Sequence, residues 1–103
     1  MQVHNLNGTA PNKCDCGSWL VHWQRFSGQT ANHCVVIGCT NPHTVGGHVQ
    51  KGSISDRGWY IIPLCSSCNA KRGETFSIYD DVELVSVNVN ITCRKAFVDP
   101  LSR

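Results

Sequence analysis

Two pairs of cysteines carry the clearest chemistry in the chain. Cys34 and Cys39 enclose a short stretch that contains a glycine, and Cys65 and Cys68 are separated by two serines. Thiolates are soft ligands, and two closely spaced pairs can place four sulfur atoms around one tetrahedral zinc ion. Four protein ligands leave no open position for water or substrate, so this zinc ion would be structural. Its binding energy would then contribute directly to folding.

Free thiols and disulfides are the other interpretations of these cysteines. The N-terminus lacks the basic and then apolar run of a secretion signal, so we expect a soluble cytoplasmic protein. No stretch approaches the roughly 20 apolar residues of a membrane span. The chain has seven cysteines, and the odd number leaves at least one outside any complete pairing. In a reducing compartment these features favour metal ligands over disulfides.

A second group of thiols precedes the first pair. Cys14 and Cys16 are separated by one residue and can hold one ion, provided that two further ligands come from elsewhere. We assign His22 and His48 to this second zinc site as its other two ligands. The other candidates are His33, His43 and Cys93.

The length of 103 residues allows one domain. The hydrophobic core of so small a domain contributes limited stability, so a bound metal ion would add substantially to it. Residues 1–12 are polar and rich in turn-forming residues, which predicts a flexible lead-in. We expect a single zinc-binding domain over residues 13–95 and a tail over residues 96–103.

The local patterns predict a small α+β domain. Ser18 to Phe26 has aromatic residues at helical spacing, with Ser18 as the N-cap and Gly28 as the stop. The other predicted elements are a turn at 34–39, strands at 45–49 and 59–64 with Pro63 ending the second, a helix at 66–72, and strands at 76–78 and 82–89. A turn with one cysteine pair, then a hairpin, then a helix with the second pair is the order of a treble-clef zinc finger. The predicted fold is therefore this finger with an N-terminal helix and additional C-terminal strands.

Residues 34–73 resemble the core of the HNH endonucleases, the treble-clef branch of the His-Me finger nucleases. The residues that carry the resemblance are Gly47-His48 and Cys65-Ser-Ser-Cys68-Asn69-Ala-Lys71. The resemblance implies that His48 is the general base and that Asn69 is a metal residue on the helix. It also implies a catalytic magnesium or manganese ion, if the chain is an active DNA or RNA endonuclease.

The chain departs from the HNH pattern in its catalytic residues. Gly47 stands where the family has an acidic metal ligand, and residues 60–63 offer no counterpart to the asparagine of the second strand. Phosphodiester hydrolysis needs charge stabilisation of the leaving oxygen, which a neutral asparagine supplies poorly. If His48 binds the second zinc ion, it cannot act as a base. We therefore favour a degenerate, non-enzymatic form of the fold.

The charge distribution bears on the partner. The formal net charge is +2, but residues 13–72 carry six bases against two acids, a net of +4. Lys51, Arg57, Lys71 and Arg72 lie in this half and are the candidate phosphate contacts. A merely solvated surface is the alternative, as it is for the acidic stretch 80–83. The leading hypothesis is a zinc-stabilised nucleic-acid-binding module; the alternatives are an active HNH endonuclease and a protein-binding zinc-finger adaptor.

Overall fold

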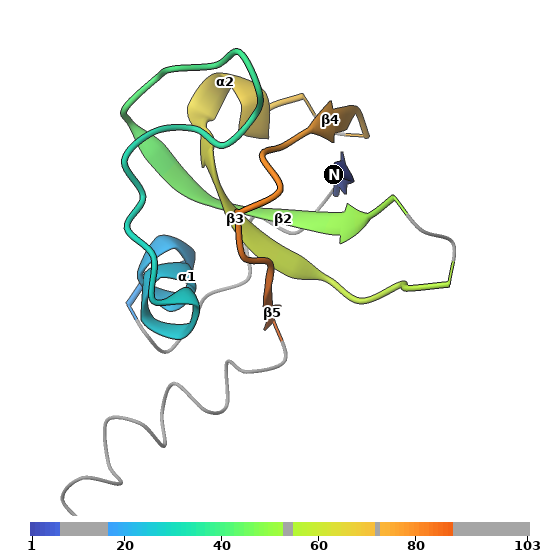
Figure 1. Ribbon diagram of the computed structural model, residues 1–103, viewed down its shortest axis with the longest axis horizontal. Helices are drawn as coiled ribbons and strands as arrows, with labels where there is room; N and C mark the ends of the chain where they lie inside the picture. Colours follow the sequence, from blue (N-terminus) through green and yellow to red (C-terminus); the bar gives the residue numbers. More distant parts are fainter. Residues whose placement is uncertain (7–16, 53–54, 72, 88–103) are drawn as a thin grey trace, which may run out of the picture.

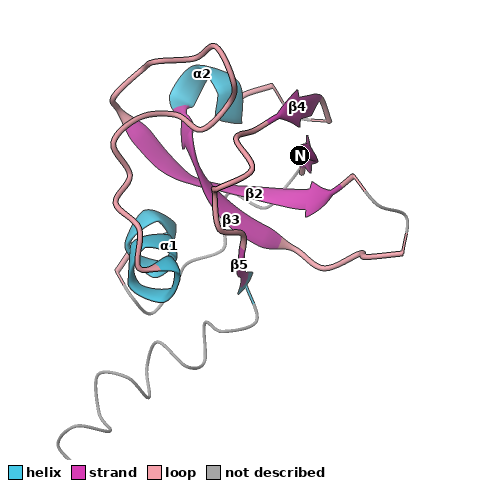
Figure 2. Cartoon of the chain, in the orientation of Figure 1, coloured by secondary structure: helices cyan, strands magenta, loops and turns pink. Residues whose placement is uncertain are grey.

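The computed structural model describes residues 1–6, 17–52, 55–71 and 73–87. These residues form an antiparallel five-stranded sheet and two helices, which confirms the predicted α+β class (Figures 1 and 2). The strand order in the sheet is β4-β1-β2-β3-β5. In chain order the elements are β1 (Gln2–Asn5), α1 (Trp19–Ser27), β2 (Thr44–Lys51), β3 (Tyr60–Cys65), α2 (Ser66–Asn69), β4 (Thr75–Ser77) and β5 (Val85–Ser86).

The β2–β3 hairpin fixes which side chains share a face of the sheet. His48 pairs with Ile61, and the neighbouring Gly47 pairs with Ile62. Because successive side chains of a strand point to opposite faces, His48 and Gly47 face opposite sides of the sheet. The register therefore divides the molecule into two layers, one on each side of the hairpin.

Each face of the sheet has its own apolar cluster. On the Gly47 face, the buried residues include Val3, Val49, Ile62, Leu64 and Ile78, packed together with three of the cysteines. On the His48 face, α1 packs Trp23 against Ile61 and Val85. The cysteine-bearing side and the α1 side thus have separate sets of buried residues, and the half-buried Val82 packs against both.

Helix α1 begins and ends as the sequence predicts. The Ser18 hydroxyl accepts a hydrogen bond from the Val21 amide at 3.1 Å, and Gly28 ends the helix in the left-handed conformation with φ of 70°. The start of the helix lies directly on Gly46 of β2. A Cβ atom at Gly46 would lie 2.5 Å from the Trp19 carbonyl carbon and 2.6 Å from the Leu20 amide nitrogen. Only glycine allows this close approach of helix and strand.

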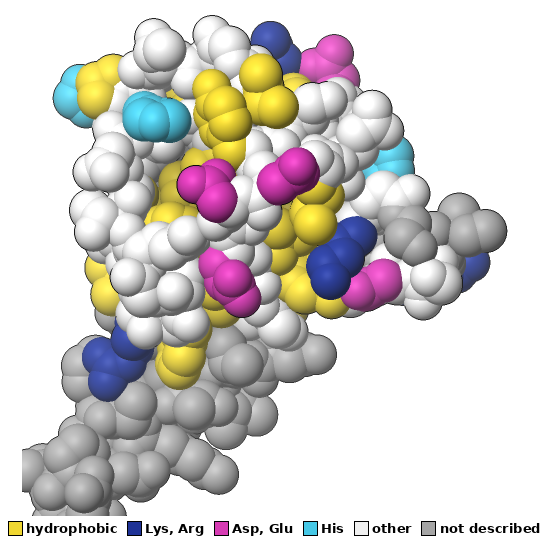
Figure 3. Space-filling model, viewed as in Figure 1, with side chains coloured by type: hydrophobic (Ala, Val, Ile, Leu, Met, Phe, Trp, Pro, Cys, Tyr) yellow, Lys and Arg dark blue, Asp and Glu magenta, His cyan; other side chains and the backbone are white. Residues whose placement is uncertain are grey.

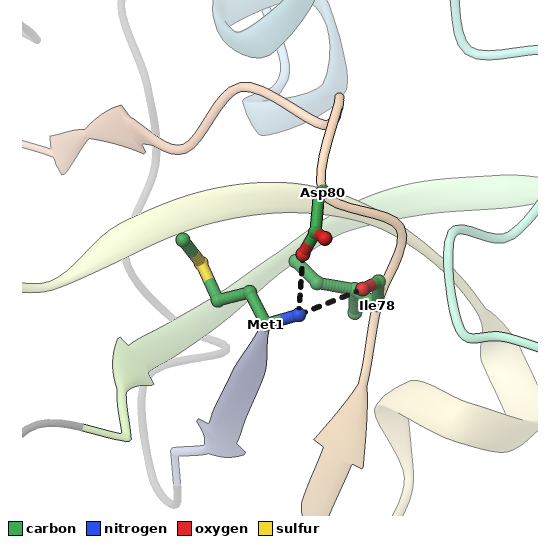
Figure 4. A network of polar contacts seen from close by, with 3 residues as sticks. All are labelled: Met1, Ile78 and Asp80. Carbon is green, nitrogen blue, oxygen red and sulfur yellow. Dashed lines mark hydrogen bonds and ion pairs between the residues drawn. The ribbon is translucent and has the colours of Figure 1, made fainter.

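The predicted flexible lead-in is wrong for residues 2–5, which form β1 between β2 and β4. Val3 is fully buried there, so a short polar-looking segment is held by its neighbours rather than by its own hydrophobic pattern. The adjacent ammonium group of Met1 donates to the Ile78 carbonyl at 3.2 Å and contacts the Asp80 carboxylate at 2.7 Å (Figure 4). Residues 7–12 of that prediction lie outside the described residues.

The sequence analysis predicted that Pro63 ends the second strand of the hairpin, and this is wrong. Pro63 lies inside β3, where it pairs with Gly46. Its carbonyl accepts a hydrogen bond from the Val35 amide at 3.2 Å, on the side away from β2. The N and the C=O of a strand residue point to the same side, so the missing N–H of Pro63 removes no bond from the β2–β3 ladder.

Other predicted elements are shorter than expected. The helix predicted at 66–72 is α2, which has four residues, and the strand predicted at 82–89 includes only the two residues of β5 among those described. The whole of the expected tail (96–103) and the last part of the expected domain (88–95) lie outside the described residues. Within the described ranges, no helix is long and apolar enough to cross a membrane.

We expect Gly46→Ala to lower the free energy of unfolding by about 2 to 3 kcal/mol, because the added methyl collides with the α1 backbone. Urea unfolding followed by circular dichroism would measure this change. The matched control is Val45→Thr on the same strand, where the side chain is 40% exposed and the β-branch is kept, with an expected change within about 0.5 kcal/mol. Equal stability of the two variants would contradict the close packing of α1 on β2.

Candidate metal centre

The structure brings the four predicted cysteine ligands together. The Sγ atoms of Cys34, Cys39, Cys65 and Cys68 all lie within 4.8 Å of one another, and those of Cys39 and Cys65 are 3.8 Å apart. A tetrahedral zinc ion with Zn–S bonds near 2.3 Å separates its sulfur ligands by about 3.8 Å. A disulfide needs an S–S distance of about 2.05 Å, and these four cysteines are unpaired. The arrangement therefore fits a metal ion, and the donor set is consistent with zinc.

The first cysteine pair stands at the two ends of a tight turn. Gly38 has φ of +89°, a conformation that other residues rarely adopt, and the Cys39 amide donates to the Val36 carbonyl at 2.9 Å. Val36 forms an isolated bridge with Ile78, which holds the turn against the chain after β4. These contacts point both sulfur atoms of the turn toward the end of β3.

The second pair sits where β3 becomes α2. Cys65 is the N-cap of α2, and its Sγ accepts a hydrogen bond from the Cys68 amide at 3.4 Å. The far end of this helix is held by Asn5 of β1, whose side-chain amide donates to the carbonyls of Cys68 at 3.3 Å and Asn69 at 2.9 Å. Asn5 is 3% exposed. No local pattern indicates this role of Asn5, because its partners are more than 60 positions away.

The surroundings of the sulfur atoms control their protonation. Burial raises the pKa of the Cys34 thiol, and burial together with contacts to Cys65 raises the pKa of the Cys68 thiol. Burial also raises the pKa of Cys65, but hydrogen bonds from Cys68, Cys39 and Cys34 outweigh it and lower the pKa to about 7. Cys34 and Cys68 therefore keep their protons at neutral pH unless a cation compensates the buried charge. Metal binding would release these protons.

The two histidines of the tentative second zinc site lie together on the α1 side of the sheet. The rings of His22 and His48 both contact Trp19, with centroid distances of 5.0 and 4.8 Å. His22 is fully buried and His48 is 6% exposed. Burial lowers the pKa of both, and the nearby His22 lowers the pKa of His48 further. Cys14 and Cys16 lie outside the described residues, so the second zinc site stays a prediction.

The geometry does not bring the two nuclease-like residues to one place. The position of a Cβ on Gly47 would be 3.1 Å from the Oδ1 atom of Asn69, so Asn69 lies on the Gly47 face of the sheet. His48 faces the opposite side and is buried beneath α1. A Cβ at Gly47 would also collide with the Leu64 side chain, which leaves no room for the acidic ligand that HNH enzymes have there.

The candidate phosphate-binding residues fall into two groups. Lys51 and Arg57 belong to the tip of the β2–β3 hairpin, where the Lys51 ammonium lies 3.4 Å from the Asp56 carboxylate and 4.8 Å from the centroid of the Tyr60 ring. Lys71 is exposed and follows α2, which lies apart from the hairpin tip in Figure 1. Arg72 lies outside the described residues.

Trp59 is an exposed aromatic residue that the sequence analysis did not identify, because it was assigned to the predicted strand 59–64. It lies at the hairpin tip with a side chain that is 41% exposed. The signal that could have found it is its neighbourhood, because Trp59 follows Arg57-Gly58 directly and precedes the first residue of β3.

No protein-family model matches the chain, and neither a search of curated proteins nor a search of solved structures found a match. The resemblance to HNH endonucleases thus rests on the motifs around residues 47–48 and 65–71, and it stays a prediction.

We expect Cys65→Ser to lose the bound metal ion and to abolish cooperative thermal unfolding, because apparent zinc-binding energies of about 10 kcal/mol or more are also folding energy. Native mass spectrometry would count the ions, and calorimetry would follow unfolding. Ser67→Ala, an exposed substitution on the same helix, should keep both the ion and the transition. A Cys65→Ser variant that binds metal and unfolds like the parent would contradict the four-cysteine centre.

Proposed function

We propose that the chain is a zinc-stabilised binding module of treble-clef, HNH-like type, and that its ligand is a nucleic acid. The observation that carries the zinc centre is the convergence of Cys34, Cys39, Cys65 and Cys68 within 4.8 Å. The order of turn, hairpin and helix around these cysteines supports the treble-clef assignment. A closed four-sulfur site supports a structural rather than a catalytic role for the ion.

The hairpin tip supports a nucleic-acid ligand. Lys51 and Arg57 supply positive charge, and Trp59, two positions after Arg57, supplies an indole that is 41% exposed. Cations contact phosphates without regard to sequence, and aromatic rings stack on exposed bases. Asp56 reduces the net charge at this tip, so binding would depend on stacking as well as on phosphate contacts. A single-stranded nucleic acid suits this combination better than a closed duplex.

The alternative of an active endonuclease has less support. His48 and Asn69 lie on opposite faces of the sheet, and Gly47 has no space for an acidic side chain. Water activation and cation binding would have to come from other residues. We therefore do not propose nuclease activity.

We expect a labelled single-stranded oligonucleotide to bind with an affinity that falls as salt is raised from about 50 to 200 mM. Trp59→Ala should weaken binding by about tenfold or more through lost stacking, and Arg57→Ala should lower the salt slope by about 1. Fluorescence anisotropy would measure both. Arg25→Ala, which removes a cation from α1, is the control that should leave the slope unchanged. Absence of salt-dependent binding to DNA and to RNA would rule out this ligand.

We also propose a second zinc ion bound by Cys14, Cys16, His22 and His48. The proposal is supported by the contacts of His22, on α1, and His48, on β2, with the same Trp19 ring. Native mass spectrometry under reducing conditions should then show two zinc ions, and His22→Gln should remove one of them while the four-cysteine ion stays. His43→Gln, at an exposed position, is the control. A parent protein with a single ion would refute the second site.

A further inference from the structure

A cavity of about 600 Å³ lies beside the metal centre and is not used by the proposed function. Its walls come from the segment that follows α1 and from the segment between β4 and β5. Its volume is within the range of about 300 to 1,000 Å³ that is typical of ligand-binding pockets. Two of its lining residues, His33 and Val35, flank the metal-binding Cys34.

One part of the cavity is apolar and rigid. Trp23 is 2% exposed, Val35 is 7% exposed and Pro63 is fully buried, and all three line the cavity. The indole N–H of Trp23 already donates to the Glu83 carbonyl at 2.7 Å. These three residues form an apolar floor with no spare donor. The half-buried Ala31 and Val82 also line the cavity and offer the accessible apolar surface for the aliphatic portion of a ligand.

The polar lining of the cavity combines neutral side chains, those of Gln29, Thr30 and Asn32, with a single carboxylate. His33 Nδ1 lies 2.8 Å from the Cys34 carbonyl, which can only accept, so Nδ1 is the donor of this bond. The His33 ring meets the Tyr79 ring edge-on, with centroids 6.4 Å apart, and Tyr79 is 40% exposed. Asp81 adds an exposed carboxylate. An exposed aromatic ring and a carboxylate both favour a cationic donor.

The charged side chains near the cavity also favour a cationic ligand. No lysine or arginine is among the lining residues that the structure describes. Figure 3 shows acidic side chains gathered on this face of the molecule, over the segment that leads from β4 to β5 in Figure 1, with lysine and arginine side chains around them. An anionic ligand such as a phosphate would be repelled here, so this surface differs in kind from the hairpin tip.

We propose that the cavity binds an arginine side chain of a partner polypeptide. The three methylene groups of the arginine would lie against Ala31 and Val82, and the guanidinium would face Asp81 and Tyr79. Arginine suits the lining better than lysine, because a planar guanidinium with five donors can bind a carboxylate and stack on an aromatic ring together. The proposal does not depend on nucleic-acid binding at the hairpin.

The test is a titration of the zinc-loaded, ¹⁵N-labelled 103-residue chain with Nα-acetyl-arginine-N-methylamide. Binding is followed by ¹H–¹⁵N NMR. The neutral probe is the corresponding citrulline derivative, which has nearly the same shape without the charge. We expect saturable shifts at residues 29–35 and 79–82 with the arginine probe, and at least about tenfold weaker binding of citrulline. Equal binding of both probes, or no shifts with arginine, would overturn the proposal.

Two variants separate a direct contact from general attraction. Asp81→Asn removes the carboxylate that lines the cavity, and Glu83→Gln removes the same charge from an exposed neighbour that does not line it. We expect about tenfold weaker arginine binding for the first and less than about twofold for the second. The spectra themselves report whether each variant is folded. Equal weakening in both variants would overturn a specific contact, and loss of oligonucleotide binding alone would leave the cavity proposal intact.

Discussion

The structure depends on one electrostatic constraint, the compensation of sulfur atoms held out of water. Cys34, Cys65 and Cys68 are at most 7% exposed, and they converge from a turn, a strand end and a helix. Buried thiolates are costly without a cation. A bound metal ion would compensate this charge and would link distant parts of a small core. The apolar cluster around the cysteines would then be organised by the ion as well as by burial.

The sheet separates two chemically different layers. On one face lie the cysteines, Asn69 and the helix that carries the second pair; on the other lie α1 and the two buried histidines. Because neighbouring residues of β2 face opposite layers, Gly47 and His48 belong to different environments despite their adjacency in sequence. Gly47-His48 and Asn69 resemble one catalytic motif in the sequence. In the structure, His48 faces one side of the sheet and Asn69 lies on the other.

Local signals in the sequence predicted part of this structure. The cysteine spacing, the caps of α1 at Ser18 and Gly28, and the β-prone runs of the hairpin each depend on neighbours within a few residues, and each is found in the structure. β1 was not predicted, because Val3 is buried by pairing with segments almost 50 and more than 70 residues away. The role of Asn5 and the position of Pro63 also depend on distant backbone groups. The cavity depends on two loops whose packing no local pattern encodes.

The position of β1 has a consequence for folding kinetics. β1 precedes β2 and β4 in the chain, yet it lies between them in the sheet, and its Asn5 side chain holds the end of the cysteine-bearing helix. During synthesis β1 can pair with β4 only after residues 75–77 have been added to the chain. Contacts between such distant segments require the closure of a long loop, which slows folding relative to local pairing. The hairpin and the four cysteines can assemble earlier, so metal capture would precede completion of the sheet.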